Sequence, residues 1–119
     1  MNIEELQKAV YAQALSKGLY KGCPGFTKLL WHIREEAGEA IRAWKEYRDL
    51  DVHYECPGAS RYCIDRDFNC PTCPRRHNEG VTMELADVII MTLSVCEYMG
   101  IDIEDAIQEK MAYNAIRKR

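Results

Sequence analysis

Four carboxylates form two matching pairs in this sequence. Glu36 and Glu39 occur in REEAGEA, and Glu84 and Asp87 occur in MELADVI. The i, i+3 spacing of each pair places both side chains on one face of a helix. Each pair borders an apolar stripe, and four acids gathered beside a core would repel one another unless a cation neutralised them. Oxygen-only ligands suit Mg²⁺, Mn²⁺ or Ca²⁺ better than zinc, so the pattern predicts a metal site for chemistry on a phosphate.

The acids also fit two other interpretations. A single i, i+3 pair is most often a solvated helix face, but two pairs that both border apolar stripes favour a metal site. A di-iron carboxylate bundle also lines its helices with acids, and that class uses Glu-x-x-His motifs. None of His32, His53 and His77 has a glutamate three positions earlier, which disfavours di-iron chemistry.

Four helices must position the acids. Apolar periodicity and capping residues predict helices over residues 2–17, 28–48, 82–100 and 103–118, with Thr27, Thr82 and Asp102 as N-caps. The predicted fold is an all-α, four-helix bundle-like protomer. The stripe expected to be buried on the second helix consists of Leu30, Ile33, Ala37, Ile41 and Trp44. The third helix is apolar nearly all round, which predicts a central helix.

Length and charge narrow the functional classes. A chain of 119 residues with 47% hydrophobic and 29% charged residues predicts one soluble domain, residues 1–119. A formal net charge of −3 offers no electrostatic footprint for nucleic acid or an anionic membrane. The longest apolar run, 88–93, is too short to span a bilayer, and the charged N-terminus is not a signal peptide. We therefore expect a cytoplasmic protein without a membrane or nucleic-acid partner.

The acid pattern and two further segments of the sequence resemble a known family. E-x-x-E followed by E-x-x-D on two helices, the segment ELADVIIMTLSV and the C-terminal element KMAYNAIRKR together resemble the MazG-like nucleotide pyrophosphohydrolases. The resemblance covers roughly residues 1–50 and 80–119. It implies an enzyme that hydrolyses an NTP or dNTP to the monophosphate and pyrophosphate. It also implies Mg²⁺ as cofactor, with Mn²⁺ as the alternative. The apolar surface of so small a bundle suggests a homodimer or homotetramer.

The resemblance assigns roles to particular residues. Glu36, Glu39, Glu84 and Asp87 are the implied metal ligands, and the neighbouring Glu35 is a candidate to hold or activate the attacking water. Lys110 and Asn114, with Arg117 as a further candidate, are implied to contact the triphosphate. Their i, i+4, i+7 spacing places these three on one stripe of a helix. The alternative for the C-terminal cations is a basic helix end that complements the helix dipole.

Aromatic residues open the second helix close to the acids. Trp31, His32 and Phe26 are candidates to stack on or hydrogen-bond a nucleobase, and His32 lies one turn before Glu36. Packing near the end of a bundle is the alternative for all three. Met91 and Tyr98, which line up with the second acid pair, are expected to fill the core instead. Cys23 and Cys96 carry no predicted role.

A Cys-rich insertion, residues 51–80, separates the acid pairs by more than the family spacing. Its cysteines follow C-x6-C-x6-C-x2-C, and a C-x2-C unit directs two thiolates at one ion. The leading prediction is structural Zn²⁺ on Cys56, Cys63, Cys70 and Cys73, with His77 as a reserve ligand. Disulfides, an iron–sulfur cluster and free thiols remain alternatives. The insertion is expected to cap the active site, set base specificity or mediate oligomerisation.

Two rival functions follow from these features. The first is a non-catalytic helical bundle whose zinc loop mediates protein–protein interaction, with the acids as a vestigial or structural cation site. Turnover in the presence of Mg²⁺ separates that rival from the enzyme. The second is nucleic-acid binding through the cysteine loop, which is disfavoured because the sequence has no basic stripe.

Overall fold

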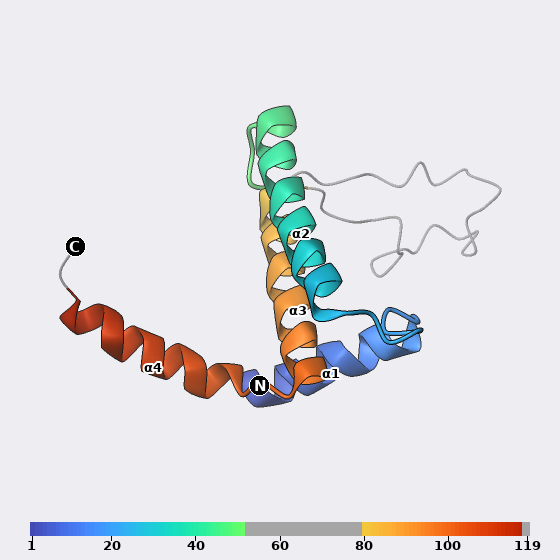
Figure 1. Cartoon of the computed structure of the whole chain (residues 1–119). Helices are drawn as coiled ribbons and strands as arrows, with labels where there is room; N and C mark the ends of the chain where they lie inside the picture. The colour runs from blue at the N-terminus through green and yellow to red at the C-terminus, as the bar shows by residue number, and fades with distance from the viewer. Residues whose placement is uncertain (52–79, 118–119) are drawn as a thin grey trace. The chain divides into compact units, whose positions relative to one another are not determined.

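The computed structural model describes residues 1–51 and 80–117 of the chain. Within these residues it contains four helices and no strand, which confirms the all-α class. They are α1 (Ile3–Ser16), α2 (Phe26–Tyr47), α3 (Val81–Met99) and α4 (Ile103–Ile116), shown in Figure 1. Most of the predicted insertion, residues 52–79, lies outside the described residues.

The chain divides into two compact units. The terminal unit comprises residues 1–35 and 87–119, and the central unit comprises residues 36–86. Because α2 and α3 both cross the boundary, each unit contains part of both helices. The terminal unit also contains α1 and α4, whereas the central unit contains the end of α2 and the start of α3.

The apolar core lies in the terminal unit. Its buried members are Tyr20, Leu29, Met91 and Val95, surrounded by Tyr11, Ala14, Leu19, Ile33 and Tyr98. The Tyr20 ring stacks on that of Tyr98 at a centroid distance of 4.4 Å and lies 5.2 Å from the Tyr11 ring. Leu29 brings α2 onto α3 in this core. The expectation that Met91 and Tyr98 fill the core is therefore confirmed.

The helix ends follow the capping chemistry of the sequence only in part. Asp102 caps α4 as predicted, because its carboxylate accepts a hydrogen bond from the Asp105 amide at 3.1 Å. Asn2 caps α1 in the same way, through the Glu5 amide at 2.8 Å. The first helix stops where predicted, since Gly18 follows its C-cap with a φ of 77°.

The two predicted threonine caps are wrong. α2 begins at Phe26 and α3 at Val81, so Thr27 and Thr82 lie inside the first turn of their helices. Glycines precede these turns instead, and their carbonyls accept the first helical bonds: Leu29 N donates to Gly25 O, and Glu84 N donates to Gly80 O. Glycine is tolerated at an N-cap almost as well as threonine, so the side chain does not decide the start.

The predicted buried stripe of α2 is wrong at four of its five positions. Leu30, Ala37, Ile41 and Trp44 are exposed, whereas Ile33 packs against the core as predicted. The buried positions of this helix are Leu29, Ala40 and Ala43. The packed face of α2 is thus rotated toward the face that carries the acids. α3 is likewise less central than predicted. Its buried residues begin at Met91, whereas large apolar side chains in its first half are exposed, namely Leu85, Ile89 and Ile90.

Candidate metal centre

Three of the four predicted acid ligands converge in the central unit. Glu36 and Glu39 come from α2 and Glu84 comes from the first turn of α3. Each offers a carboxylate oxygen, and these oxygens all lie within 4.8 Å of one another. All three residues are half-buried. The structure therefore brings together one complete acid pair and the first member of the other.

The face of α2 that carries the acids is also its packed face. Glu36, Glu39, Ala40 and Ala43 follow the i, i+3, i+4, i+7 spacing, so they lie on one side of the helix. The two alanines are buried, which leaves the carboxylates half-buried beside them rather than on a solvated face. This arrangement disfavours the interpretation of the first acid pair as an ordinary solvated helix surface.

The start of α3 is fixed against the chain that follows α2. The Thr82 amide donates to the Leu50 carbonyl at 3.0 Å. Gly80 is buried beside the same segment, and a Cβ atom at Gly80 would lie 2.7 Å from the Leu50 carbonyl carbon and 2.8 Å from the Asp51 Cα. Only glycine permits so close a backbone approach. This contact sets where the first turn of α3 begins, and with it the position of Glu84.

The electrostatics of the cluster favour a cation. The guanidinium of Arg42 lies 3.8 Å from Glu39, but the Arg42 side chain is 70% and the Glu39 side chain 45% exposed, so water screens this pair. One carboxylate oxygen of Glu84 is fully shielded from solvent. Three carboxylates at this separation repel one another, and a hard divalent cation with oxygen ligands relieves that repulsion. The donor set thus fits Mg²⁺ or Mn²⁺ by its chemistry.

The remaining predicted catalytic acids lie outside this cluster. Asp87 follows Glu84 by one turn of α3 and is exposed. Glu35 directly precedes Glu36 on α2 and is also exposed. Neither belongs to the group of three whose oxygens converge.

The predicted triphosphate donors all belong to the terminal unit. Lys110 and Asn114 lie on α4, and Arg117 is its C-cap residue; all three are exposed. The Lys110 ammonium lies 4.9 Å and the Arg117 guanidinium 5.6 Å from the centre of the Tyr113 ring. These two cations therefore share one aromatic neighbour, which sequence reasoning missed.

The candidate base-contacting residues differ in exposure. Trp31 is 54% exposed, and the Arg34 guanidinium lies over its ring at 4.7 Å. Phe26 is exposed and His32 is half-buried. Sequence reasoning also missed Arg34 and Arg42. Each follows its partner by three positions on α2, so helical spacing was the available signal.

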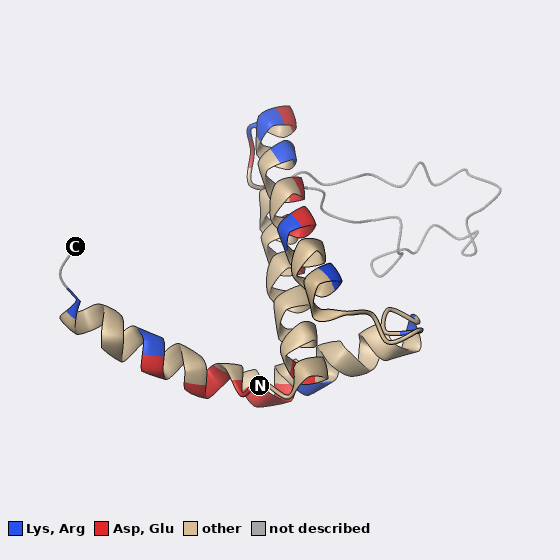
Figure 2. Cartoon of the chain, viewed as in Figure 1, with Lys and Arg blue, Asp and Glu red and all other residues tan. Residues whose placement is uncertain are grey.

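Charges of both signs are mixed in this part of the protein. On the side of the described residues that Figure 2 shows, basic and acidic residues are interspersed along α2 rather than gathered into a basic stripe. The predicted zinc ligands Cys56, Cys63, Cys70 and Cys73, like His53 and His77, lie outside the described residues. Cys23 is an exposed free thiol, whereas Cys96 is buried, and burial raises the pKa of the Cys96 thiol.

Comparison with known proteins identifies the family. None of the helices in residues 1–51 and 80–117 has the length and apolarity needed to cross a membrane. No curated protein and no solved structure matches the chain. The family model described as the MazG nucleotide pyrophosphohydrolase domain matches residues 25–118, which include all of α2, α3 and α4. Since that match spans well over half of the sequence, the chain belongs to the MazG nucleotide pyrophosphohydrolase family.

Proposed function

We propose that this protein hydrolyses a nucleoside triphosphate, either an NTP or a dNTP, to the monophosphate and pyrophosphate in a Mg²⁺-dependent reaction. The observation that carries the proposal is the convergence of Glu36, Glu39 and Glu84 within 4.8 Å. It occurs in a chain whose family consists of nucleotide pyrophosphohydrolases that typically use a divalent metal. Mn²⁺ is the alternative cation, because it accepts the same oxygen ligands.

The three convergent carboxylates hold the cation in this proposal. Asp87 is the proposed fourth ligand, since it follows Glu84 on the next turn of α3. When bound, the cation would neutralise triphosphate charge and make a water more acidic. The role of α2 and α3 is to present these oxygens together before any substrate arrives, so that little reorganisation is needed.

The remaining residues bind and orient the reactants. Lys110 and Asn114, with Arg117, are proposed to donate hydrogen bonds to triphosphate oxygens, and their exposure on α4 leaves them accessible to an anion. Trp31 offers an exposed aromatic face for stacking on the nucleobase. His32, half-buried on the next position, is a proposed hydrogen-bond partner of the base.

The proposed reaction has no covalent intermediate. Glu35 orients the attacking water and accepts its proton. The water oxygen forms a bond to phosphorus as the bond between the α- and β-phosphoryl groups breaks, and pyrophosphate leaves. One water is consumed, and one proton is released to solvent from the carboxylate. General-base assistance of this kind typically contributes about 10²–10⁴-fold in rate.

Two accessory features belong to the same proposal. Exposed apolar side chains on α2, among them Ile41 and Trp44, support assembly into a homodimer or homotetramer. Sedimentation measurements test that assembly. Structural Zn²⁺ on Cys56, Cys63, Cys70 and Cys73 is proposed from the cysteine spacing alone, and elemental analysis of the purified protein tests it.

The activity is tested with a panel of canonical and modified NTPs and dNTPs, with and without Mg²⁺. Release of pyrophosphate with a matching monophosphate is the expected result, and it should require the cation. Glu84→Gln is expected to abolish turnover while leaving the helical content unchanged. Glu46→Gln is the matched control, because Glu46 is an exposed acid on α2 outside the cluster. A fully active Glu84→Gln enzyme would refute the assignment.

A further inference from the structure

The connection between α3 and α4 is short and capped at both ends. Gly100 adopts a φ of 71°, its amide donates to Glu97 O at 3.2 Å, and the Ile101 amide donates to Cys96 O at 2.8 Å. These two bonds form the glycine-ended motif that closes many helices. Asp102 then caps α4. Only Gly100, Ile101 and Asp102 therefore separate the two helices.

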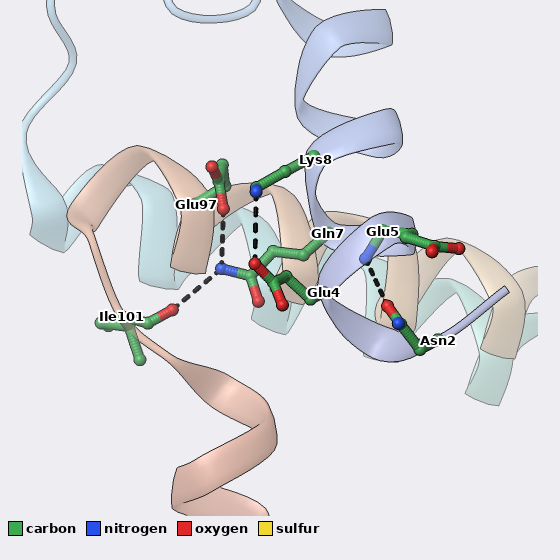
Figure 3. Close-up of polar contacts among 7 residues, drawn as sticks. All are labelled: Asn2, Glu4, Glu5, Gln7, Lys8, Glu97 and Ile101. Atoms are coloured by element: carbon green, nitrogen blue, oxygen red, sulfur yellow. Dashed lines mark hydrogen bonds and ion pairs between the residues drawn. The ribbon is translucent and has the colours of Figure 1, made fainter.

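The side chain of Gln7 reaches this connection from α1. Its amide nitrogen donates to Glu97 Oε2 at 3.0 Å and to the Ile101 carbonyl at 2.8 Å (Figure 3). One nitrogen thus ties α1 both to the last turn of α3 and to the connection itself. Gln7 is only 6% exposed, which is unusual for glutamine. Buried hydrogen bonds that satisfy all donors are worth more than exposed ones.

Among the described residues, few buried contacts fix the direction of α4. None of its residues is buried, so no apolar face of α4 packs into the core of the terminal unit. α4 contacts α1. A helix of 14 residues with no fully buried side chain is marginal in water by itself. The hydrogen bonds from Gln7 to Glu97 and Ile101 are therefore direct links between α1 and the connection from which α4 starts.

We propose that Gln7 is a positioning residue that sets the direction of α4, and with it the placement of Lys110 and Asn114. The effect on substrate rests on the proposed function, in which these donors bind the triphosphate. Gln7 touches no substrate itself. It acts by holding the Ile101 carbonyl and the Glu97 carboxylate, so that α4 leaves α3 in one direction before the nucleotide binds.

Gln7→Leu removes both donors at similar volume and is the first test. Gln13→Leu is the matched control, because Gln13 is exposed on the same helix. Amide hydrogen exchange should become faster over 103–116 in Gln7→Leu and stay unchanged in the control. Residues 26–35 of α2 serve as an internal reference, because global unfolding would accelerate both segments alike. Unchanged exchange over 103–116 in Gln7→Leu would overturn the proposal.

The nucleotide kinetics provide a second measurement. If α4 is no longer held in one direction, nucleotide binding should weaken by about the equivalent of one hydrogen bond, which is about fivefold. KM of Gln7→Leu should therefore rise about fivefold at nearly constant kcat. Gln7→Glu should raise KM further, because the introduced carboxylate would face the Glu97 carboxylate and repel it. Combining it with Glu97→Gln should restore part of the loss by re-forming one hydrogen bond. Faster exchange over 103–116 with an unchanged KM would overturn the link to substrate binding.

The two measurements separate this inference from the function on which it rests. If no nucleotide is hydrolysed by the wild-type chain, the proposed function fails. The exchange of residues 103–116 still decides then whether Gln7 holds α4, because that measurement needs neither substrate nor cation.

Discussion

The hydroxyl oxygens of Tyr20 and Ser94 lie 2.6 Å apart inside the terminal unit, where Ser94 is 1% exposed. Tyr20 belongs to the connection between α1 and α2, and Ser94 belongs to α3. This hydrogen bond therefore joins the connection to the helix on which the core is built. One hydroxyl donates to the other, so removing either one leaves the second buried without this partner.

Substitutions at Tyr20 and Ser94 should have non-additive effects on the free energy of unfolding. Tyr20→Phe and Ser94→Ala are each expected to lower the free energy of unfolding by about 1–3 kcal/mol, because each strands a buried hydroxyl. The double variant should lose less than the sum, since neither hydroxyl is then stranded. Urea denaturation of the four proteins measures this. Tyr113→Phe, at an exposed tyrosine, is the control, and strictly additive losses at Tyr20 and Ser94 would contradict the argument.

Alkaline pH should weaken the fold through Tyr20. Burial raises the pKa of Tyr20 above its ordinary value of 10.0, and the hydrogen bond to Ser94 opposes part of that rise. Above pH 10.0 the unfolded chain loses this proton first, so the stability contributed by neutral Tyr20 falls as pH increases toward the folded pKa. Urea midpoints measured on both sides of that pH should fall more steeply in the wild type than in Tyr20→Phe. If the urea midpoints of the wild type and of Tyr20→Phe fall in parallel with pH, Tyr20 does not contribute to the pH dependence of stability.

Divalent cations should stabilise the central unit through the acid cluster. At a Mg²⁺ concentration one hundred times its Kd, binding adds about 2.7 kcal/mol to the free energy of unfolding. Glu36→Gln should lose most of this gain, because it removes one of three convergent carboxylates. Thermal denaturation with and without Mg²⁺ or Mn²⁺ measures the effect. Glu46→Gln should keep the full gain, and an equal gain in Glu36→Gln would place the cation elsewhere.

Two glycines should respond oppositely to the same substitution. Gly80→Ala places a Cβ against the backbone of Leu50 and Asp51, which cannot give way as a side chain does, so we expect a loss of about 1–3 kcal/mol. Gly38→Ala meets only the Arg42 guanidinium at 3.7 Å and lies within α2, so it should gain about 0.5–1 kcal/mol. Mg²⁺ affinity should fall only in Gly80→Ala, because the start of α3 shifts. Equal stability of the two variants would refute the close approach.

The two described free thiols should differ in reactivity. Cys23 is exposed in the connection before α2, whereas Cys96 is buried and its thiol pKa is raised by that burial. Since the thiolate is the reactive species, alkylation at neutral pH should modify Cys23 long before Cys96. Peptide mass spectrometry after timed labelling measures the two rates. Denaturant is the control that should abolish the difference, and equal rates in the native protein would contradict the burial of Cys96.

Much of the candidate site was predictable because local spacing determines it. The i, i+3 spacing of Glu36 and Glu39 predicted a shared helix face. The acids on both middle helices predicted that Glu84 and Asp87 would join them; Glu84 does, whereas Asp87 lies outside the group of three. Asp102 was predictable as a cap for the same reason, since an N-cap contacts an amide only three positions away.

Other features were not predictable because their partners are distant in the sequence. The large apolar residues Ile41 and Trp44 suggested the wrong buried face of α2, whereas Ala40 and Ala43 give a weak hydrophobic signal despite their burial. Gln7 carries no signal of burial, because its partners Glu97 and Ile101 are 90 and 94 positions away. The prediction of Thr82 as an N-cap was wrong because the Leu50 carbonyl accepts from the Thr82 amide and fixes the start of α3.

The close approach of Gly80 to Asp51 also bears on how the sequence between them is free to change. The chain leaves the central unit's helices and returns to them at one point, since a Cβ at Gly80 would lie 2.8 Å from the Asp51 Cα. When the two ends of a flexible connection meet, the entropic free-energy cost of closing it grows only with the logarithm of its length. Each doubling of the length adds about 0.6 kcal/mol. The positions of Glu36, Glu39 and Glu84 are therefore expected to be independent of the number of residues between Asp51 and Gly80.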